Sequence, residues 1–218
     1  MNDDHPLNKK AVAVSNDPIV FIIDDDIGLL DALSSLLRSI GLRVETFPSV
    51  AGFVQYPRPD VPSCLVLDVR LQGTSGLDFQ NELARANVCL PIVFMTGHGD
   101  IAMTVRAMKA GAVDFLAKPF REQDLLDAVT SALDKDKQSR EAQKTTRQMR
   151  ARYATLTPRE QEIMALAASG LMNKQIAGEI GLSEITVKIH RGHAMKKMHA
   201  KSFAELVRMA QLLEIRSS

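Results

Sequence analysis

Three carboxylates in the first half of the chain stand at the ends of apolar runs. Asp24 and Asp25 directly follow IVFII, and Asp68 ends SCLVLD. Carboxylates that meet at one point repel one another, and burying one without a partner is costly. Such a group therefore needs a cation. Mg²⁺ or Mn²⁺ fits best, because these hard ions prefer carboxylate oxygens and water as ligands.

A hydroxyl and an ammonium group follow the same pattern. Thr96 ends LPIVFMT, and Lys118 follows AVDFLA. A carboxylate beside a metal ion, a hydroxyl and an ammonium group can act as a nucleophile toward phosphorus. The metal ion and the lysine would then neutralise the phosphoryl oxygens. Asp26 has a different expected role, as the cap of the helix that follows it.

The elements that must position these residues alternate between strand and helix. Apolar runs predict buried strands at 19–24, 42–47, 63–68, 90–96 and 112–117. Helical spacing predicts helices at 28–40, 76–86, 100–110 and 122–135, and a weaker one at 49–56. This alternation is typical of a five-stranded, doubly wound parallel α/β sheet with helices on both faces. Functional groups of such sheets gather beyond the C-terminal strand ends, so the residues named above should share one rim.

Four segments resemble the signature segments of response-regulator receiver domains: FIIDDD, LVLDVRL, IVFMTGHGD and AVDFLAKPF. The resemblance covers about residues 19–135 and implies a flavodoxin-like receiver whose phosphoacceptor is Asp68. It also implies a set of metal ligands, namely Asp24, Asp25, Asp68 and the backbone carbonyl of Arg70. By the same resemblance, Thr96 bonds the phosphoryl group and Lys118 pairs with it. Phe115 is the aromatic residue that turns inward when Thr96 moves.

The second half of the chain carries the opposite charge. Residues 17–135 hold 10 Lys+Arg against 16 Asp+Glu, a net charge of −6, whereas residues 136–218 hold 15 against 8, a net charge of +7. This asymmetry predicts two domains with different partners, with nucleic acid as the partner of the basic one. We expect an N-terminal tail at 1–16, a receiver at 17–135, a polar linker at 136–153 that could extend the preceding helix, and a DNA-binding domain at 154–218.

Only helical patterns follow the linker. They predict helices at 158–169, 173–180, 184–198 and 202–213. Capping residues stand at their starts, namely Thr157 before Pro158, Asn173, Ser183 and Ser202. The second and third of these helices, with Gly181 between them, have the helix-turn-helix pattern. Within 184–198, one face holds Val187, Ala194 and Met198 and should pack inward, which leaves a basic face for a major groove.

The segments LTPRE, NKQIA and TVK resemble the LuxR/FixJ-type DNA-binding domain. The resemblance covers about residues 154–214. It implies that the helix at 184–198 reads double-stranded DNA and that the last helix contributes to dimerisation. The expected DNA-contacting residues are Lys174, Thr186, Lys188, Ile189, Arg191, Lys196 and Lys197.

Histidines and cysteines are not expected to form a metal site. His190 is interpreted as a packed, hydrogen-bonded residue, and His193 and His199 have no carboxylate or cysteine at ligand spacing in the sequence. Cys64 and Cys89 lie in apolar runs, which predicts two reduced, buried thiols.

Membrane association is also not expected. The N-terminal residues lack the apolar stretch of a secretory signal. No segment approaches the roughly 20 apolar residues that cross a bilayer. We therefore expect a cytoplasmic protein.

Together the two resemblances imply a two-component response regulator of the FixJ/NarL type. A sensor histidine kinase would phosphorylate Asp68, the phosphorylated chain would form a homodimer, and the dimer would bind a promoter and act on RNA polymerase. Its only enzymatic activities would be self-catalysed phosphotransfer and dephosphorylation.

Two alternatives remain open at this point. One is an aspartyl phosphatase of the haloacid-dehalogenase type, whose D-x-D pattern Asp24–Asp26 matches. That family has Thr or Val where this chain has Gly28. The other is a constitutive DNA-binding protein whose receiver serves as a fixed interaction module.

Overall fold

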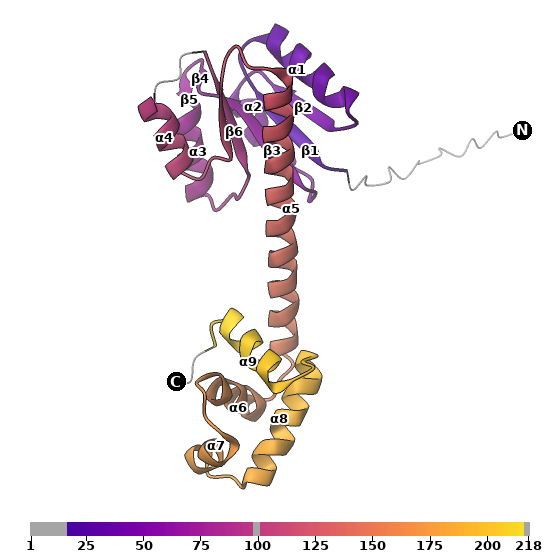
Figure 1. The fold of residues 1–218 in the computed structure, drawn as a ribbon, viewed down its shortest axis with the longest axis vertical. Helices are drawn as coiled ribbons and strands as arrows, with labels where there is room; N and C mark the ends of the chain where they lie inside the picture. The colour runs from indigo at the N-terminus through magenta and orange to yellow at the C-terminus, as the bar shows by residue number, and fades with distance from the viewer. Residues whose placement is uncertain (1–16, 98–100, 216–218) are drawn as a thin grey trace, which may run out of the picture. The chain divides into compact units, whose positions relative to one another are not determined.

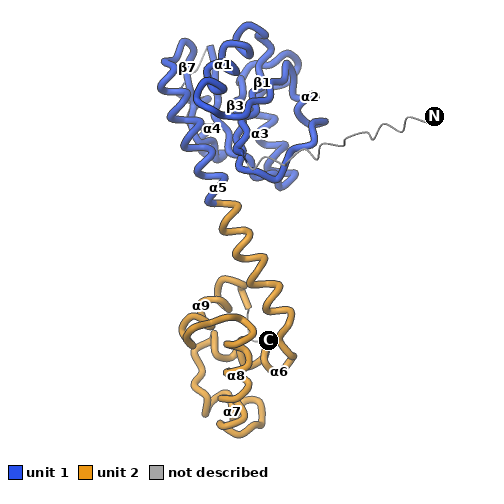
Figure 2. The backbone as a smooth tube through the Cα atoms, turned by 90° about the vertical axis from the view of Figure 1, so that its right-hand side faces the viewer, with its two compact units in different colours: residues 1–138 blue, residues 139–218 orange. Residues whose placement is uncertain are grey.

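The computed structural model describes residues 17–97 and 101–215. Within it the chain divides into two compact units, residues 1–138 and 139–218, coloured blue and orange in Figure 2. Each unit has hydrophobic clusters of its own. The predicted tail at 1–16 lies outside the described residues, as do 98–100 of the loop after Thr96 and the last residues, 216–218.

Unit 1 is built on a parallel sheet. Its strands are β1 (Ile19–Ile23), β2 (Arg43–Phe47), β3 (Ser63–Asp68), β6 (Ile92–Thr96) and β7 (Asp114–Ala117). They lie in the order β2-β1-β3-β6-β7, and every neighbouring pair is parallel. All residues of β1, β3 and β6 are buried, which agrees with their uninterrupted apolar sequences. The predicted doubly wound sheet is confirmed, with strand ends displaced by one or two residues.

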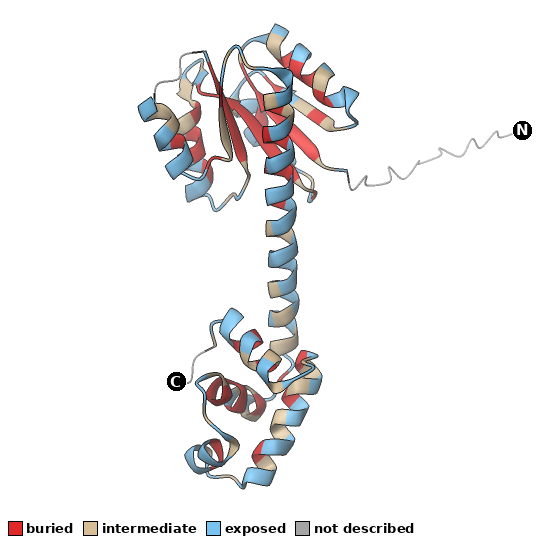
Figure 3. Ribbon diagram, in the orientation of Figure 1, coloured by how far each residue is buried: buried red, intermediate tan, exposed pale blue. Residues whose placement is uncertain are grey.

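Helices cover both faces of this sheet (Figure 1). Their bounds are α1 (Ile27–Ser39), α2 (Val50–Gln55), α3 (Gly76–Arg85), α4 (Ile101–Lys109) and α5 (Glu122–Tyr153). Val20 and Ile22 of β1 pack with α1 and α5 on one face. Phe21 of the same strand packs with α2, α3 and α4 on the other, because successive strand residues point to opposite faces. Figure 3 shows the buried sheet in red between helices whose outer surfaces are exposed.

The start of α1 confirms the role expected for Asp26. Its carboxylate oxygen Oδ1 accepts a hydrogen bond from the backbone N–H of Leu29 at 3.1 Å. This leaves only Asp24 and Asp25 of the three consecutive aspartates for other chemistry.

A short hairpin that the sequence pattern did not predict follows β3. Its strands are β4 (Arg70–Leu71) and β5 (Thr74–Ser75), paired antiparallel. A strand of two residues is too short to show an alternation of apolar and polar residues, so the sequence pattern does not predict it.

The prediction that both cysteines are buried is wrong for Cys89. Cys64 is buried within β3, but Cys89 is exposed in the connection between α3 and β6. The apolar run around Cys89 begins before the strand does, so its first residues lie in a surface loop.

Helix α5 is continuous for 32 residues and includes the segment predicted as a linker. Its apolar buried residues end at Leu133. Asp136 is also buried, and its Oδ2 accepts a hydrogen bond from the backbone N–H of Ser63 at 2.8 Å. Asp136, the first residue of the predicted linker, is therefore part of the packing of unit 1. The polar residues that follow remain helical because most of them have high helix propensity.

The described part of unit 2 continues with α6 (Pro158–Ala168), α7 (Asn173–Ile180), α8 (Glu184–Met198) and α9 (Phe203–Leu212). Met164 of α6 packs with buried residues of α8 and α9. Ile163 of α6 packs with buried residues of α7 and α8. Gly181 ends α7 with φ +65°, a left-handed conformation that suits glycine. Ser183 then caps α8 by accepting the N–H of Thr186 at 3.1 Å. The predicted helix-turn-helix is confirmed.

Asn173 is not the helix cap that the sequence predicted. Met172 occupies the cap position of α7, and its backbone N–H donates to Oε1 of Gln175 at 2.9 Å. The Asn173 side chain instead accepts a hydrogen bond from Nη1 of Arg191 at 2.9 Å. Asn173 thereby links α7 to α8, because Gln175 already supplies a partner for the helix start.

Crossing a bilayer requires a long apolar helix, and the described residues contain no helix that meets both conditions.

Candidate functional site

The acidic residues meet where the two central strands end. β1 and β3 pair in parallel from Ile19 opposite Ser63 to Ile23 opposite Leu67. Because of this register, Asp24 and Asp68 leave the same edge of the sheet side by side. One carboxylate oxygen from each of Asp24, Asp25 and Asp68 lies within 4.8 Å of the other two. The three residues are called the acidic cluster below.

Lys118 brings a positive charge to the acidic cluster from the end of β7. Its Nζ lies 2.6 Å from Oδ2 of Asp24 and 3.4 Å from Oδ1 of Asp68. The backbone N–H of Lys118 donates to the carbonyl of Thr96 at 2.7 Å, which holds the lysine beside the end of β6. The ammonium group therefore sits between two carboxylates that would otherwise repel each other.

Burial works against the charge of Asp68. The residue is 6% exposed. Burial raises the pKa of its carboxyl most strongly, Lys118 lowers it, Asp24 raises it and a backbone hydrogen bond from Arg70 lowers it. The net effect leaves the Asp68 pKa above its ordinary value. A further positive charge beside this carboxylate would stabilise its ionised form.

Thr96 and Phe115 lie on neighbouring strands near the acidic cluster. Thr96 ends β6 with no exposed surface and stands opposite Ala117 of β7. Phe115 stands opposite Phe94, and the centroids of their rings are 6.2 Å apart. Phe115 is only partly buried. An inward rotation of its ring would therefore bury further apolar surface.

Gly76 lies against the acidic cluster, and the sequence pattern did not single it out. A Cβ on this residue would lie 2.4 Å from the backbone oxygen of Asp68 and 3.2 Å from Cα of Val69. The N–H of Gly76 donates to the carbonyl of Val69 at 2.9 Å. Only glycine allows α3 to begin this close to the acidic residue. The sequence could have indicated this close approach only through the glycine itself, which stands eight residues after Asp68 in the motif LQGTSGL.

The acidic cluster suits a hard divalent cation. All its side-chain donors are carboxylate oxygens, the ligand type that Mg²⁺ selects. Asp24 and Asp68 are buried, while Asp25 is partly exposed and leaves an approach for water. Arg70, whose carbonyl was the other expected ligand, lies two residues after Asp68 in β4.

In unit 2, helix α8 has the two faces that its sequence predicted. Val187, Ala194 and Met198 have no exposed surface. Lys188 and Ile189 are exposed on the other side of the helix. Gly192 and Lys196 are exposed as well.

Some of the predicted DNA-contacting residues also have partners within unit 2. Arg191 donates to Asn173, and its guanidinium carbon lies 4.6 Å from the centroid of the Phe203 ring. Lys197 pairs with Glu160 at 2.7 Å. The hydroxyl of Thr186 lies 2.8 Å from that of Ser183. The remaining lysines of the set, Lys174, Lys188 and Lys196, are exposed.

Ile185 is exposed on α8 and was absent from the predicted set. It is 72% exposed, and Ile189, one turn later, is 52% exposed. The sequence signal was the four-residue spacing of two isoleucines outside the packed positions. Apolar side chains at such positions can contact the methyl group of thymine.

Comparison with known proteins identifies both units. The model of the response regulator receiver domain matches residues 20–130, and the model of the luxR family of bacterial regulatory proteins matches residues 154–210. The chain belongs to the two-component response regulators. Within that family, this response regulator joins a receiver to a LuxR-type DNA-binding domain, as the sequence resemblances implied.

The response regulator is similar to relatives along nearly its whole length. It is 59% identical to nodulation protein W of Bradyrhizobium diazoefficiens, over 92% of this chain and 88% of that protein. It is 46% identical to the response regulator protein TmoT of Ectopseudomonas mendocina, over 90% of this chain and 89% of that protein. It is 39% identical to the transcriptional regulatory protein FixJ of Azorhizobium caulinodans, over 88% of this chain and 92% of that protein. The response regulator is thus a transcription regulator and not a classical enzyme.

Solved structures lead to the same family. The response regulator StyR matches with a TM-score of 0.77 and 48% identity, over 89% of this chain and 98% of that one. Full-length FixJ from B. japonicum matches with a TM-score of 0.53 and 36% identity, over 90% of this chain and 97% of that one. A receiver joined to a LuxR-type domain implies a histidine kinase and DNA as partners of this response regulator.

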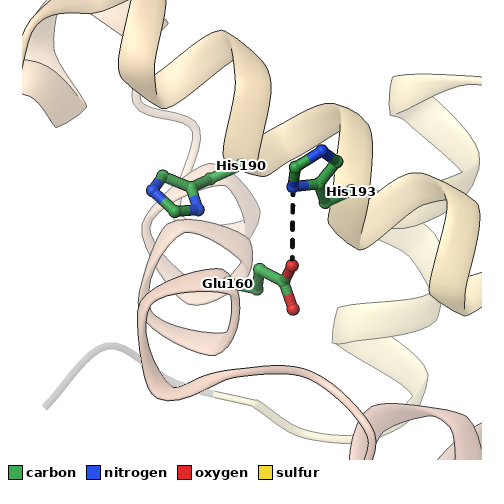
Figure 4. A group of neighbouring side chains, drawn as sticks. All are labelled: Glu160, His190 and His193. Carbon is green, nitrogen blue, oxygen red and sulfur yellow. Dashed lines mark ion pairs between the residues drawn. The ribbon is translucent and has the colours of Figure 1, made fainter.

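The prediction that His193 has no carboxylate partner is wrong, because the structure brings Glu160 to it from another helix. Glu160 of α6 faces His190 and His193 of α8, and one possible ligand atom of each lies within 4.8 Å of the others (Figure 4). The expected hydrogen bonding of His190 is also incomplete. Its Nδ1 is buried and has no hydrogen-bond partner among the described residues. Glu160 is distant in sequence, so spacing along the chain does not reveal the group.

Proposed function

We propose that Asp68 accepts a phosphoryl group from a sensor histidine kinase. A carboxylate oxygen of Asp68 attacks phosphorus, and the phosphorus–nitrogen bond of the kinase phosphohistidine breaks. The observation that carries this proposal is the position of Asp68 at the sheet edge, with Lys118 at 3.4 Å and two further carboxylates in the acidic cluster. Lys118 can move from the carboxylates to the phosphoryl oxygens as their negative charge arrives. Release of the phosphoryl group to water, catalysed by the same chain, completes the cycle.

Asp24, Asp25, Asp68 and the carbonyl of Arg70 would hold the divalent ion, Mg²⁺ or Mn²⁺. When bound, this ion neutralises phosphoryl oxygens and favours the charged form of Asp68. The residues of the chain have their own tasks. Asp24 orients Lys118, and Asp25, the more exposed carboxylate, lies on the solvent side of the cluster.

The conformational signal passes through Thr96 and Phe115. An acyl phosphate adds about −1.5 to −2 charge and three acceptor oxygens. The Thr96 hydroxyl moves toward these oxygens, and the partly buried ring of Phe115 rotates into the space that Thr96 leaves. This rotation changes the surface formed by α4 and β7, which is a local charge change acting on a two-state element.

The changed surface pairs two receivers, and the homodimer binds promoter DNA in the cytoplasm and acts on RNA polymerase. Two DNA-binding domains in one dimer read two half-sites, so the second contact is made at a high effective concentration. α9 contributes to pairing of the DNA-binding domains. Lys188 and Ile189 contact base edges, and Ile185 adds a thymine-methyl contact. Lys174, Lys196 and Lys197 contact phosphates, while Thr186 and Arg191 both position α8 and contact DNA.

The phosphorylation proposal is tested by incubating the full chain with acetyl phosphate and Mg²⁺. We expect acid-labile, stoichiometric labelling of wild type and none of Asp68→Asn. Asp25→Ala should be labelled at least tenfold more slowly with its thermal stability unchanged or raised, because one repelling carboxylate is gone. Asp31→Ala, an exposed residue of α1, serves as the matched control. Labelling that does not depend on Asp68 would favour the fixed interaction module, and multiple turnover of a small phosphate ester would favour a phosphatase.

The DNA-binding proposal is tested on operator fragments selected from random DNA with the phosphorylated protein. Lys188→Ala should weaken operator binding by about 1–3 kcal/mol if Lys188 contacts a base. Lys144→Ala removes an exposed lysine of α5 and should leave affinity nearly unchanged. Equal affinities of Lys188→Ala and wild type at moderate salt would exclude Lys188 from the contact surface.

A further inference from the structure

Three side chains with metal-binding atoms converge between α6 and α8 of unit 2. His190 and His193 lie three residues apart on one side of α8, and Glu160 lies in the first turn of α6 (Figure 4). We propose that these three residues bind a divalent transition-metal ion of the zinc class. This site is separate from the acidic cluster and plays no part in the phosphorylation proposed above.

The spacing of the ligand atoms supports the proposal. One atom of each residue lies within 4.8 Å of the others, and Nδ1 of His193 is 3.9 Å from Oε1 of Glu160. Ligand atoms around a tetrahedral zinc ion are about 3.3 Å apart, given metal–ligand distances of about 2.0–2.1 Å. Closing the site therefore requires the ligand atoms to approach one another by up to about 1.5 Å, a distance that side-chain rotation can supply. His193 is largely exposed, so its ring is free to make that movement.

His190 supplies a second, independent observation. Its Nδ1 is buried and has no hydrogen-bond partner among the described residues. Buried polar atoms of native proteins nearly always have a hydrogen-bond partner. A buried polar atom that lacks one indicates a partner that is not part of the protein. A metal ion is such a partner for an imidazole ring.

Glu160 is held in the orientation that a ligand needs. Its Oε2 accepts hydrogen bonds from Nζ of Lys197 at 2.7 Å and from the backbone N–H of Thr157 at 2.8 Å. Oε1 is left on the side of His193. Burial raises the pKa of Glu160, but the hydrogen bonds from Lys197 and Thr157 outweigh it, so the pKa lies below its ordinary value. The carboxylate is therefore charged at neutral pH, and the backbone N–H of Thr157 can keep its direction when Lys197 moves away.

The ligand types define the class of ion. Two imidazoles and one carboxylate suit Zn²⁺, Co²⁺, Ni²⁺ or Cu²⁺, whereas Mg²⁺ and Ca²⁺ prefer sites made only of oxygen. Lys197 opposes any such ion, since its ammonium group lies on the same carboxylate. Binding would move Lys197 away from Glu160 and would join α6 to α8.

The experiment titrates the full-length, tag-free protein with Co²⁺ in excess Mg²⁺, which occupies the acidic cluster. Visible absorption reports Co²⁺ in a four-coordinate nitrogen–oxygen site, and competition by Zn²⁺ gives the zinc affinity. We expect one such site in wild type and at least tenfold weaker binding in His193→Gln, whose exposed side chain can change without unfolding the protein. Lys197→Gln should bind about threefold to tenfold tighter, the effect of removing one unit charge near a divalent ion in a water-like dielectric.

A stability measurement gives a second readout. Zn²⁺ at 100 times its dissociation constant should shift the folding equilibrium of unit 2 by about 100-fold in wild type. At the same Zn²⁺ concentration the shift should fall to about 10-fold or less in His193→Gln, whose binding is at least tenfold weaker. His199→Asn is the matched control, because His199 lies outside the group and its left-handed backbone (φ +59°) tolerates asparagine. The proposal is overturned if His193→Gln binds like wild type, if His199→Asn loses binding, or if Co²⁺ shows only the weak visible absorption of the hydrated ion.

Discussion

At the scale of the residue, the site depends on charges held closer together than they would lie in water. Asp24 and Asp68 share one lysine, and both carboxylates are buried. Such an arrangement is unfavourable to the fold and useful for chemistry, since an incoming metal ion relieves the imbalance. We expect consequences for stability as well as for activity.

One consequence is a pH dependence of stability that Asp68 causes. Its raised pKa means that the folded protein retains this proton at pH values where the unfolded chain has lost it. The contribution of Asp68 is therefore most favourable below the ordinary pKa of about 3.8 and is lost as pH rises through the raised value. Without metal, Asp68→Asn should be more stable than wild type at pH 7, with the difference shrinking toward pH 4.

Denaturant unfolding from pH 4 to pH 7 checks this expectation. Asp31→Asn, which changes an exposed carboxyl outside the acidic cluster, serves as the matched control. A lower stability of Asp68→Asn than of wild type at neutral pH would mean that the ion pair with Lys118 outweighs the cost of burial.

A second consequence concerns Gly76. Alanine at this position places Cβ 2.4 Å from the backbone oxygen of Asp68, so the backbone must shift. We expect Gly76→Ala to lose about 1–3 kcal/mol of unfolding free energy and to slow phosphorylation. In Gly52→Ala the nearest atom to the new Cβ is 3.6 Å away. That control in helix α2 should therefore change stability by less than about 1 kcal/mol. Equal stability of both variants would show that the backbone accommodates the new methyl group easily.

At the scale of the element, α5 has two kinds of surface along one helix. Its first part carries an apolar stripe that packs on the sheet of unit 1, from Leu125 to Leu133. Between Glu141 and Thr145 every residue is exposed. Asp136 lies between the two regions and attaches the helix to β3 by a hydrogen bond.

Asp136 should therefore set how far along α5 the packing of unit 1 extends. Asp136→Ala leaves the buried N–H of Ser63 without this partner and should cost about 1–3 kcal/mol. Asp134→Ala removes an exposed carboxylate two residues earlier and should stay within about 0.5 kcal/mol of wild type. Thermal unfolding and amide exchange at the start of β3 measure the effect. No difference between the two variants would mean that water replaces the Asp136 contact at no cost.

At the scale of the whole molecule, the chain joins an acidic unit to a basic one, each with its own core. Helix α4 of the acidic unit exposes an apolar row, with Ile101 at 85%, Val105 at 43% and Met108 at 43% exposed. Exposed apolar side chains at helical spacing are typical of a surface that is covered on association. We expect this row to lie in the dimer interface of the phosphorylated chain.

Val105→Lys tests that expectation, because a buried, unpaired ammonium group in the interface is costly. Sedimentation of the beryllofluoride-treated chain should show a dimer for wild type and a monomer for Val105→Lys at the same concentration. Ala84→Lys adds the same charge at an exposed position of α3 and should still dimerise. If Val105→Lys forms a dimer at the same concentration as wild type, the dimer interface does not include this row of α4.

The sequence alone determined the class of fold and the residues of the acidic site. Uninterrupted apolar runs predict buried parallel strands, and Asp24, Asp68, Thr96 and Lys118 stand at or just after strand ends. A strand end is a local feature, and parallel strands bring their C-terminal ends to one edge, so the neighbourhood follows from order along the chain. The inward face of α8 was predictable for a similar reason, since helical periodicity is also local.

Only the tertiary structure decided the contacts between residues that no local pattern connects. Asp136 reaches Ser63, Arg191 reaches Asn173, and Glu160 reaches two histidines of α8. Each of these pairs depends on how whole elements pack, which is set by the sum of many apolar contacts and by no spacing along the chain. The close approach of Gly76 to Asp68 belongs to the same group, because a missing side chain becomes meaningful only when the backbone opposite it is known.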